Sequence, residues 1–309
     1  MKKVAFIFPG QGSQKIGMGK DFFENSDIAK DMIKKASDRL GVNFEELLFK
    51  ENENLGKTEY TQPAILLVSA IAFKLFEDKS DIKPEFLLGH SLGEFSALVA
   101  AGAIDYLDAI ELVHKRGLFM NEACSGGNAG MMALVGLEDS KVELICKEQR
   151  ENGKKVWPAN YNMDGQLVLA GIKADLESLV DTFTQAGAKR AIVLDMSVAS
   201  HCELLTSAVE NLRPYLEEYI KDEFSPVVSN VSTDIYTTKE EAIELLASQL
   251  TSPVKYKQSI EKHASKVDLF IEFGNGVVLK GLNRKIVKVP TSNVSDISSL
   301  EKVIGDINE

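Results

Sequence analysis

One segment, LLGHSLGEFSALVAAG at residues 87–102, constrains the fold of this chain more than any other. An apolar run enters the segment and a helical pattern leaves it, so Ser91 stands between a predicted buried strand and a predicted helix. Gly89 and Gly93 complete the pattern G-x-S-x-G, and they permit a turn sharp enough to push the serine side chain outward. A strand, a sharp turn and a helix in this order are typical of an α/β enzyme with a serine nucleophile.

Other segments repeat the strand–loop–helix pattern. VAFIFPG at 4–10 is predicted to be a buried strand that ends in the glycine-rich loop GQGSQKIGMG, and helical patterns follow near 20–40 and 62–77. Such units in series predict a largely parallel sheet covered by helices. With 309 residues, the chain is long enough to bury one large core and an inserted smaller unit.

The pattern changes at SGGNAG, residues 125–130. The next segments predict the order β-α-β-β-α-β, with a turn at Asp164-Gly165 and a capping box of Ser140 and Glu143 on the first helix. This order is typical of a ferredoxin-like unit. We therefore predict a small domain at 126–197, inserted into a large α/β domain formed by 1–125 and 198–309.

Charge and hydropathy exclude several classes of function. The net charge of −11 argues against a nucleic-acid-binding surface. The longest apolar stretch, at 64–73, is about half as long as a membrane span, and the N-terminal apolar run is too short for a signal peptide. Cys124, Cys146 and Cys202 lack metal-ligand spacing. We expect a cytoplasmic protein with no metal and no membrane or nucleic-acid partner.

A serine nucleophile needs a base, and the chain has four histidines. His114 and His263 lie in charged stretches, so we predict that both are solvated at the surface. His90 adjoins Ser91, but its side chain should face away at a tight turn. His201 is the remaining candidate.

His201 precedes a strongly amphipathic pattern, with Ser200 and Glu203 spaced as a capping box. This spacing predicts that His201 is the first residue of a helix. The positive helix end would then favour the neutral imidazole that a base requires. The alternative is a first-turn histidine at the surface, because the sequence alone does not bring His201 to Ser91.

Two backbone amides are candidates for an oxyanion hole. The N–H of Leu92 follows the nucleophile at a helix N-terminus, and Gln11 lies between two glycines in the first loop. The same loop does not fit a phosphate-binding motif, because Lys15 stands where G-x-G-x-x-G needs glycine and Met18 where the Walker pattern needs lysine.

Arg116 lies in a helical pattern among apolar neighbours, and a guanidinium in such surroundings needs an anionic partner. The neighbours three and four residues away are Leu112, Val113, Phe119 and Met120. One interpretation is a structural ion pair with an Asp or Glu. The other is a substrate carboxylate held by two parallel hydrogen bonds, which predicts an acyl group that carries its own carboxylate.

Together these residues resemble the malonyl-CoA:acyl carrier protein transacylases of fatty acid synthesis, over nearly the whole chain. The matching blocks, in order, are FPGQGSQ at 8–14, TQPA at 61–64, GHSLGE at 89–94, RGLFM at 116–120, NYNMDGQ at 160–166, SHC at 200–202, QLTSPV at 249–254 and EFGNGVVLKGL at 272–282. The chain departs from the family pattern at Met163-Asp164, where Ser-Pro is usual, and at Asn275, where proline is usual.

The resemblance implies a fold, a set of site residues and two partners. The fold would be an α/β-hydrolase-like large domain with a ferredoxin-like insertion. The catalytic pair would be Ser91 and His201, with the oxyanion hole formed by Gln11 and Leu92. The substrate-binding residues would be Arg116 for the malonyl carboxylate, Gln249 and His90. The partners would be malonyl-CoA and an acyl carrier protein bearing phosphopantetheine, with no cofactor bound by this chain, which we expect to be a monomer.

Two other functions stay open from the sequence. A serine thioesterase or hydrolase would need an acidic third residue between nucleophile and histidine, and Asp195 occupies that interval. A binding module would keep the fold without becoming acylated. For an acidic carrier protein, the candidate docking surfaces are Lys189 with Arg190, or Arg284 with Lys285 and Lys288.

Overall fold

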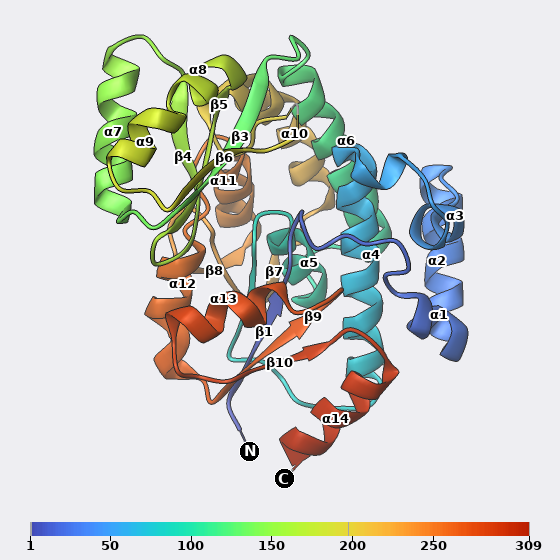
Figure 1. Cartoon of the computed structure of the whole chain (residues 1–309). Helices are drawn as coiled ribbons and strands as arrows, with labels where there is room; N and C mark the ends of the chain where they lie inside the picture. The colour runs from blue at the N-terminus through green and yellow to red at the C-terminus, as the bar shows by residue number, and fades with distance from the viewer. Residues whose placement is uncertain (1, 197, 309) are drawn as a thin grey trace.

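The computed structural model describes residues 2–196 and 198–308. It contains one six-stranded sheet and one four-stranded sheet, and Figure 1 shows the smaller sheet at the upper left of the larger one. None of the described helices is both long enough and apolar enough to span a membrane.

The large sheet has the strand order β10-β9-β1-β2-β7-β8, and every pair is parallel except β7 with β8. Its strands are β1 (Val4–Phe8), β2 (Phe86–Gly89), β7 (Glu223–Val228), β8 (Ile235–Thr238), β9 (Leu269–Phe273) and β10 (Thr291–Val294). Every residue of β1, β2 and β9 is buried. Helices cover both faces of a parallel sheet, so successive side chains of such a strand are all buried. This is why these strands have continuous apolar sequences.

Eleven of the described helices belong with this sheet. They are α1 (Lys20–Asn25), α2 (Asp27–Leu40), α3 (Phe44–Phe49), α4 (Thr58–Glu77), α5 (Gly93–Ala100), α6 (Tyr106–Ala123), α10 (Thr206–Tyr219), α11 (Lys239–Gln249), α12 (Tyr256–His263), α13 (Val278–Ile286) and α14 (Ile297–Asn308). Short 3₁₀ turns occur at Asn54–Gly56, Glu203–Leu205 and Ala264–Lys266. The helix expected near 20–40 is divided at Ser26, an extended residue whose side chain caps α2.

The small sheet has the order β4-β5-β3-β6, with every pair antiparallel. Its elements are β3 (Ala129–Val135), α7 (Asp139–Glu151), β4 (Val156–Met163), β5 (Gln166–Ile172), α8 (Lys173–Ser178), α9 (Val180–Gln185) and β6 (Arg190–Val193). This βαββαβ arrangement confirms the predicted fold class, a largely parallel α/β unit with a ferredoxin-like insertion. The division at 1–125, 126–197 and 198–309 stays a prediction.

The capping box predicted for α7 is wrong. The N-cap residue is Glu138, so Ser140 lies inside the first turn of the helix. The Glu143 carboxylate accepts a hydrogen bond from the Tyr161 hydroxyl at 2.7 Å rather than reaching back to the helix start. Packing of α7 against β4 therefore decides the position of this side chain.

Two backbone hydrogen bonds connect the small sheet to the rest of the chain at Val254. Val254 N–H donates to the Ala159 carbonyl at 2.8 Å, and Tyr161 N–H donates to the Val254 carbonyl at 2.9 Å. These bonds tie β4 to the segment that leads into α12. The carboxyl ends of β1 and β2 therefore face the small sheet, and a cavity lies between these strand ends and the small sheet.

Candidate active site

The sharp turn after β2 holds Ser91 in a left-handed backbone conformation, with φ of 53°. Only glycine fits at the positions two residues before and two residues after Ser91. A Cβ at Gly89 would lie 1.8 Å from the Gly93 carbonyl carbon, and one at Gly93 would lie 2.0 Å from the Phe8 carbonyl oxygen. The predicted turn therefore brings β1, β2 and α5 together at the serine.

The structure brings Ser91 and His201 together across 110 residues of sequence, with Ser91 Oγ 2.7 Å from His201 Nε2. The other ring nitrogen, Nδ1, lies 2.8 Å from the Gln249 backbone carbonyl. A carbonyl only accepts, so Nδ1 carries the proton and Nε2 is the free acceptor. This tautomer allows the imidazole to take the serine proton.

The predicted reason for a neutral His201 is wrong. His201 is not the first residue of a helix, because its φ is 61° and α10 begins only at Thr206. In this loop conformation His201 Nδ1 still forms its hydrogen bond to the Gln249 carbonyl. Instead, burial and, after it, the nearby Arg116 charge together lower the pKa of His201 to about 3.

The remaining histidines lie in different surroundings. His90 Nε2 donates to Asn162 Oδ1 on β4 at 2.8 Å, and burial lowers the pKa of His90. The prediction of a solvated His263 is wrong, because it is only 3% exposed and donates to the Thr233 carbonyl. It packs against the ring of Phe86, an apolar neighbour that its charged local sequence did not reveal.

Arg116 is 1% exposed, and its guanidinium points toward Ser91. Its Nη1 donates to Gln62 Oε1 at 2.8 Å and its Nη2 to Gln249 Oε1 at 3.0 Å. Nη2 also lies 3.4 Å from Ser91 Oγ, and the guanidinium stands over the ring of Phe95. These oxygen partners are neutral, so the positive charge is free to attract an anionic group in the cavity.

The Glu94 carboxylate balances the Arg116 charge indirectly, because the Gln249 side chain lies between them. Gln249 Nε2 donates to Glu94 Oε2 at 2.7 Å, so one amide joins the cation to the carboxylate. The Tyr236 hydroxyl and the Asn230 N–H also donate to this carboxylate. Burial raises the pKa of Glu94 to about 7, whereas burial lowers that of Arg116 to about 10. Arg116 therefore stays charged near neutral pH.

The cavity has a volume of about 420 Å³, enough for a small acyl group and part of a thioester arm. Ser91, His201 and Arg116 line it, as do the predicted oxyanion residues Gln11 and Leu92. The small sheet supplies the opposite wall through β3, β4 and β5. In the part of the chain that the structure describes, no group of three or more His, Cys, Asp or Glu is arranged to hold a metal ion.

Asp195 also lines the cavity, but it does not complete a triad. The Gln249 carbonyl occupies the position beside His201 Nδ1 where a serine hydrolase places a carboxylate. A carbonyl orients the ring without stabilising the imidazolium as strongly as a carboxylate does. The site therefore favours exchange between groups of similar reactivity over attack on a stable ester or amide.

Three buried residues of the site carried no role in the sequence analysis: Gln62, Glu94 and Asn230. Gln62 and Glu94 lie inside quoted sequence blocks, at 61–64 and 89–94, which was the available signal. Asn230 has no motif around it. It lies close to Ser91 only because β7 pairs with β2.

The serine is hydrogen-bonded to a neutral imidazole, and it lies on a largely parallel sheet with a ferredoxin-like insertion. These features together define a class of serine acyltransferases. Residues 5–306 match the acyl transferase domain family. A Bacillus subtilis protein named malonyl CoA-acyl carrier protein transacylase is 42% identical over 313 residues, covering 100% of this chain and 98% of the relative. A relative of the same name from Haemophilus influenzae is 41% identical and covers 98% of each chain.

Solved structures agree with these relatives. The crystal structure of a malonyl-CoA:acyl carrier protein transacylase from Helicobacter pylori has a TM-score of 0.97 at 43% identity, covering 100% of this chain and 99% of its own. A type II polyketide synthase carrier protein in complex with its malonyl-transacylase gives 0.95 at 38% identity, over 98% and 99%. The chain belongs to the malonyl CoA-acyl carrier protein transacylase family.

Proposed function

We propose that this chain transfers the malonyl group from malonyl-CoA to the phosphopantetheine thiol of an acyl carrier protein, through a malonyl-Ser91 intermediate. One observation carries the proposal: Ser91 Oγ lies 2.7 Å from His201 Nε2 and 3.4 Å from Arg116 Nη2. A nucleophile, a base and a fixed cation thus meet at one oxygen. The names of the relatives and the carrier-protein complex support the same acyl donor and acceptor.

In the first half-reaction, His201 Nε2 accepts the Ser91 proton as Oγ attacks the thioester carbonyl. The backbone N–H groups of Gln11 and Leu92 stabilise the oxyanion that forms. Collapse of this intermediate breaks the carbon–sulfur bond, and His201 returns its proton to the CoA thiolate. The malonyl group is then an ester on Ser91.

In the second half-reaction, the phosphopantetheine thiol replaces CoA. His201 takes the thiol proton as the sulfur attacks the ester, and it then protonates Ser91 Oγ. The two thioesters are similar in energy, so the reaction is nearly balanced. It needs no cofactor held by this chain, because CoA and phosphopantetheine belong to the substrate and the partner.

Arg116 would select the malonyl group, and the bound malonyl carboxylate would strengthen His201 as a base. The malonyl carboxylate pairs with the guanidinium through its free charge. In this structure that charge contributes to the lowered pKa of His201. A bound carboxylate would offset this effect, so malonyl-CoA makes His201 a better proton acceptor than acetyl-CoA does.

A basic surface on α13 is the better of the two predicted docking sites for the carrier protein. Val278, Leu279 and Leu282 of α13 line the active-site cavity. Lys280, Arg284 and Lys288 line a neighbouring cavity of about 520 Å³. A carrier docked there would need to extend its phosphopantetheine arm past α13 to reach Ser91.

We also propose that the protein acts as a monomer in the cytoplasm, where this acyl donor and carrier would meet.

The test mixes the protein with malonyl-CoA and a carrier protein that bears phosphopantetheine. We expect malonyl-carrier thioester as the product, with ping-pong kinetics. Rapid release of free malonate would instead indicate a serine hydrolase. Binding of malonyl-CoA with no transfer would indicate a binding module.

Reversing charge at Arg284 and Lys285 together, with glutamate at both positions, tests the docking surface. We expect transfer to the carrier to slow by about tenfold or more at low salt, because the association rate depends on charge complementarity. Acylation of Ser91 by malonyl-CoA should keep its rate. The matched control reverses Lys189 and Arg190, and an unchanged transfer rate in the first variant rules out the α13 surface.

A further inference from the structure

Asn230 lies two residues after the end of β7, and its side chain forms hydrogen bonds to the backbone on both sides of the nucleophile turn. Its side-chain Oδ1 accepts the Ser91 N–H at 2.7 Å, and its Nδ2 donates to the Gly89 carbonyl at 2.7 Å. The residue is fully buried. No other side chain among residues 2–196 and 198–308 bonds to both of these backbone groups.

These two bonds reproduce the pattern of a parallel strand. β2 and β7 pair as parallel strands as far as Leu88 and Val228. In such a ladder, one residue donates to the carbonyl before its partner and accepts from the N–H after it. The Asn230 carboxamide does this around His90, with a side chain in place of a peptide group. The sheet is thereby extended into a turn whose backbone has left the strand conformation.

The backbone of Asn230 is also held from two sides. Its N–H donates to Glu94 Oε2 on α5 at 3.2 Å, and its carbonyl accepts from the Lys255 N–H at 2.9 Å. Glu94 is a buried residue of α5, and Lys255 is the N-cap residue of α12. The carboxamide therefore presents its two polar atoms to the turn from a fixed position.

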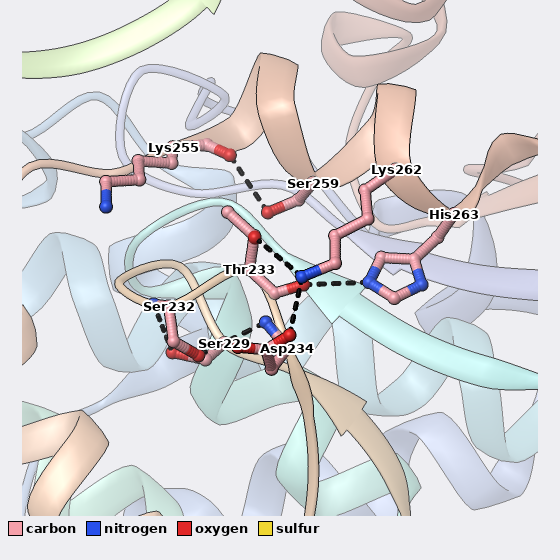
Figure 2. Close-up of polar contacts among 8 residues, drawn as sticks. All are labelled: Ser229, Ser232, Thr233, Asp234, Lys255, Ser259, Lys262 and His263. Carbon is pink, nitrogen blue, oxygen red and sulfur yellow. Dashed lines mark hydrogen bonds and ion pairs between the residues drawn. The ribbon is translucent and has the colours of Figure 1, made fainter.

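The rest of the loop from 229 to 234 is anchored to α12, as Figure 2 shows. His263 Nε2 donates to the Thr233 carbonyl at 2.8 Å, and Lys262 forms an ion pair with Asp234. Ser229 Oγ closes the loop by accepting the Ser232 N–H at 3.3 Å. Thr233 has a positive φ of 66°, a conformation that such contacts must hold.

We propose that Asn230 is a positioning residue for catalysis, which holds Ser91 in the left-handed conformation that aims Oγ at His201 Nε2. This inference rests on the proposed function, because it takes Ser91 as the nucleophile. Without the carboxamide, the Ser91 N–H and the Gly89 carbonyl lose their partners. The turn then relaxes toward ordinary strand geometry, and Oγ moves away from the imidazole.

The test compares Asn230→Ala with Asn283→Ala by single-turnover acylation with malonyl-CoA. Asn283 is an equally buried asparagine with two side-chain hydrogen bonds, to Tyr256 and Thr291, and none to the turn. We expect the Asn230 variant to acylate about a hundredfold more slowly, since small misplacement of a reacting group has effects of this size. Its KM for malonyl-CoA should stay within about twofold of the native value, because Arg116 is untouched. The control should acylate at a near-native rate.

Asn230→Asp provides a second variant if the alanine variant does not fold. It keeps an oxygen for the Ser91 N–H but loses the donor to Gly89, so we expect a smaller loss, about tenfold. An Asn230→Ala rate no lower than that of Asn283→Ala would overturn the inference, as would a native rate for Asn230→Asp. If the native protein itself forms no malonyl adduct, the proposed function fails instead.

Discussion

His201→Ala is expected to slow acylation of Ser91 by malonyl-CoA by about a thousandfold or more, because it removes the acceptor for the serine proton. His201 Nε2 is the hydrogen-bond acceptor for Ser91 Oγ, and its Nδ1 bond to Gln249 fixes the tautomer. The measurement is the single-turnover rate of adduct formation, followed by mass spectrometry under saturating malonyl-CoA.

His114→Ala is the matched control for this prediction. His114 also forms a hydrogen bond through Nδ1 to a backbone carbonyl, that of Glu59, but it is not among the residues that line the cavity. Its variant should acylate at the native rate. If His201→Ala acylates within tenfold of the native protein, another group takes the proton and the proposed base is wrong.

Arg116→Ala is expected to lower kcat/KM for malonyl-CoA and to raise it for acetyl-CoA. Loss of one partner from a buried charge pair is worth about 2–5 kcal/mol, which corresponds to roughly 30-fold to several thousandfold in rate. Acetyl transfer should improve because removal of the guanidinium raises the pKa of His201. The ratio of the two kcat/KM values, measured in parallel, isolates selectivity from any general loss of activity.

Arg116→Lys separates charge from geometry. Lysine keeps a positive charge but lacks the planar fork, so we expect malonyl activity between those of the native protein and the alanine variant. Arg39→Ala removes an arginine that is exposed and paired with Asp108 and Glu111, and it should change neither rate. Equal malonyl activity in native protein and Arg116→Ala would contradict the role assigned to this residue.

Local patterns in the sequence were sufficient for much of the fold. The turn at Ser91 needs glycine at two fixed positions, so G-x-S-x-G between a strand and a helix predicted its backbone correctly. The alternation of elements after residue 125 likewise predicted the antiparallel small sheet. These features depend on residues that are near each other in the chain.

Features that depend on distant contacts were not predictable in this way. The amphipathic pattern after His201 suggested a helix start, but the residue is held in a loop by a bond to the Gln249 carbonyl, 48 residues away. His263 has charged neighbours in sequence, yet packing against Phe86 buries it. The link from Arg116 through Gln249 to Glu94 joins three separate segments, and Asn230 reaches Ser91 only through the β2–β7 pairing.

The most direct test of the proposed mechanism is intact-mass analysis after brief mixing with malonyl-CoA, run beside Ser91→Ala. We predict that the native chain gains one malonyl group, that the Ser91 variant gains none, and that added carrier protein removes the group faster than water does. A native chain that leaves malonyl-CoA unchanged and gains no mass, or an equal adduct on Ser91→Ala, would contradict a malonyl-Ser91 intermediate.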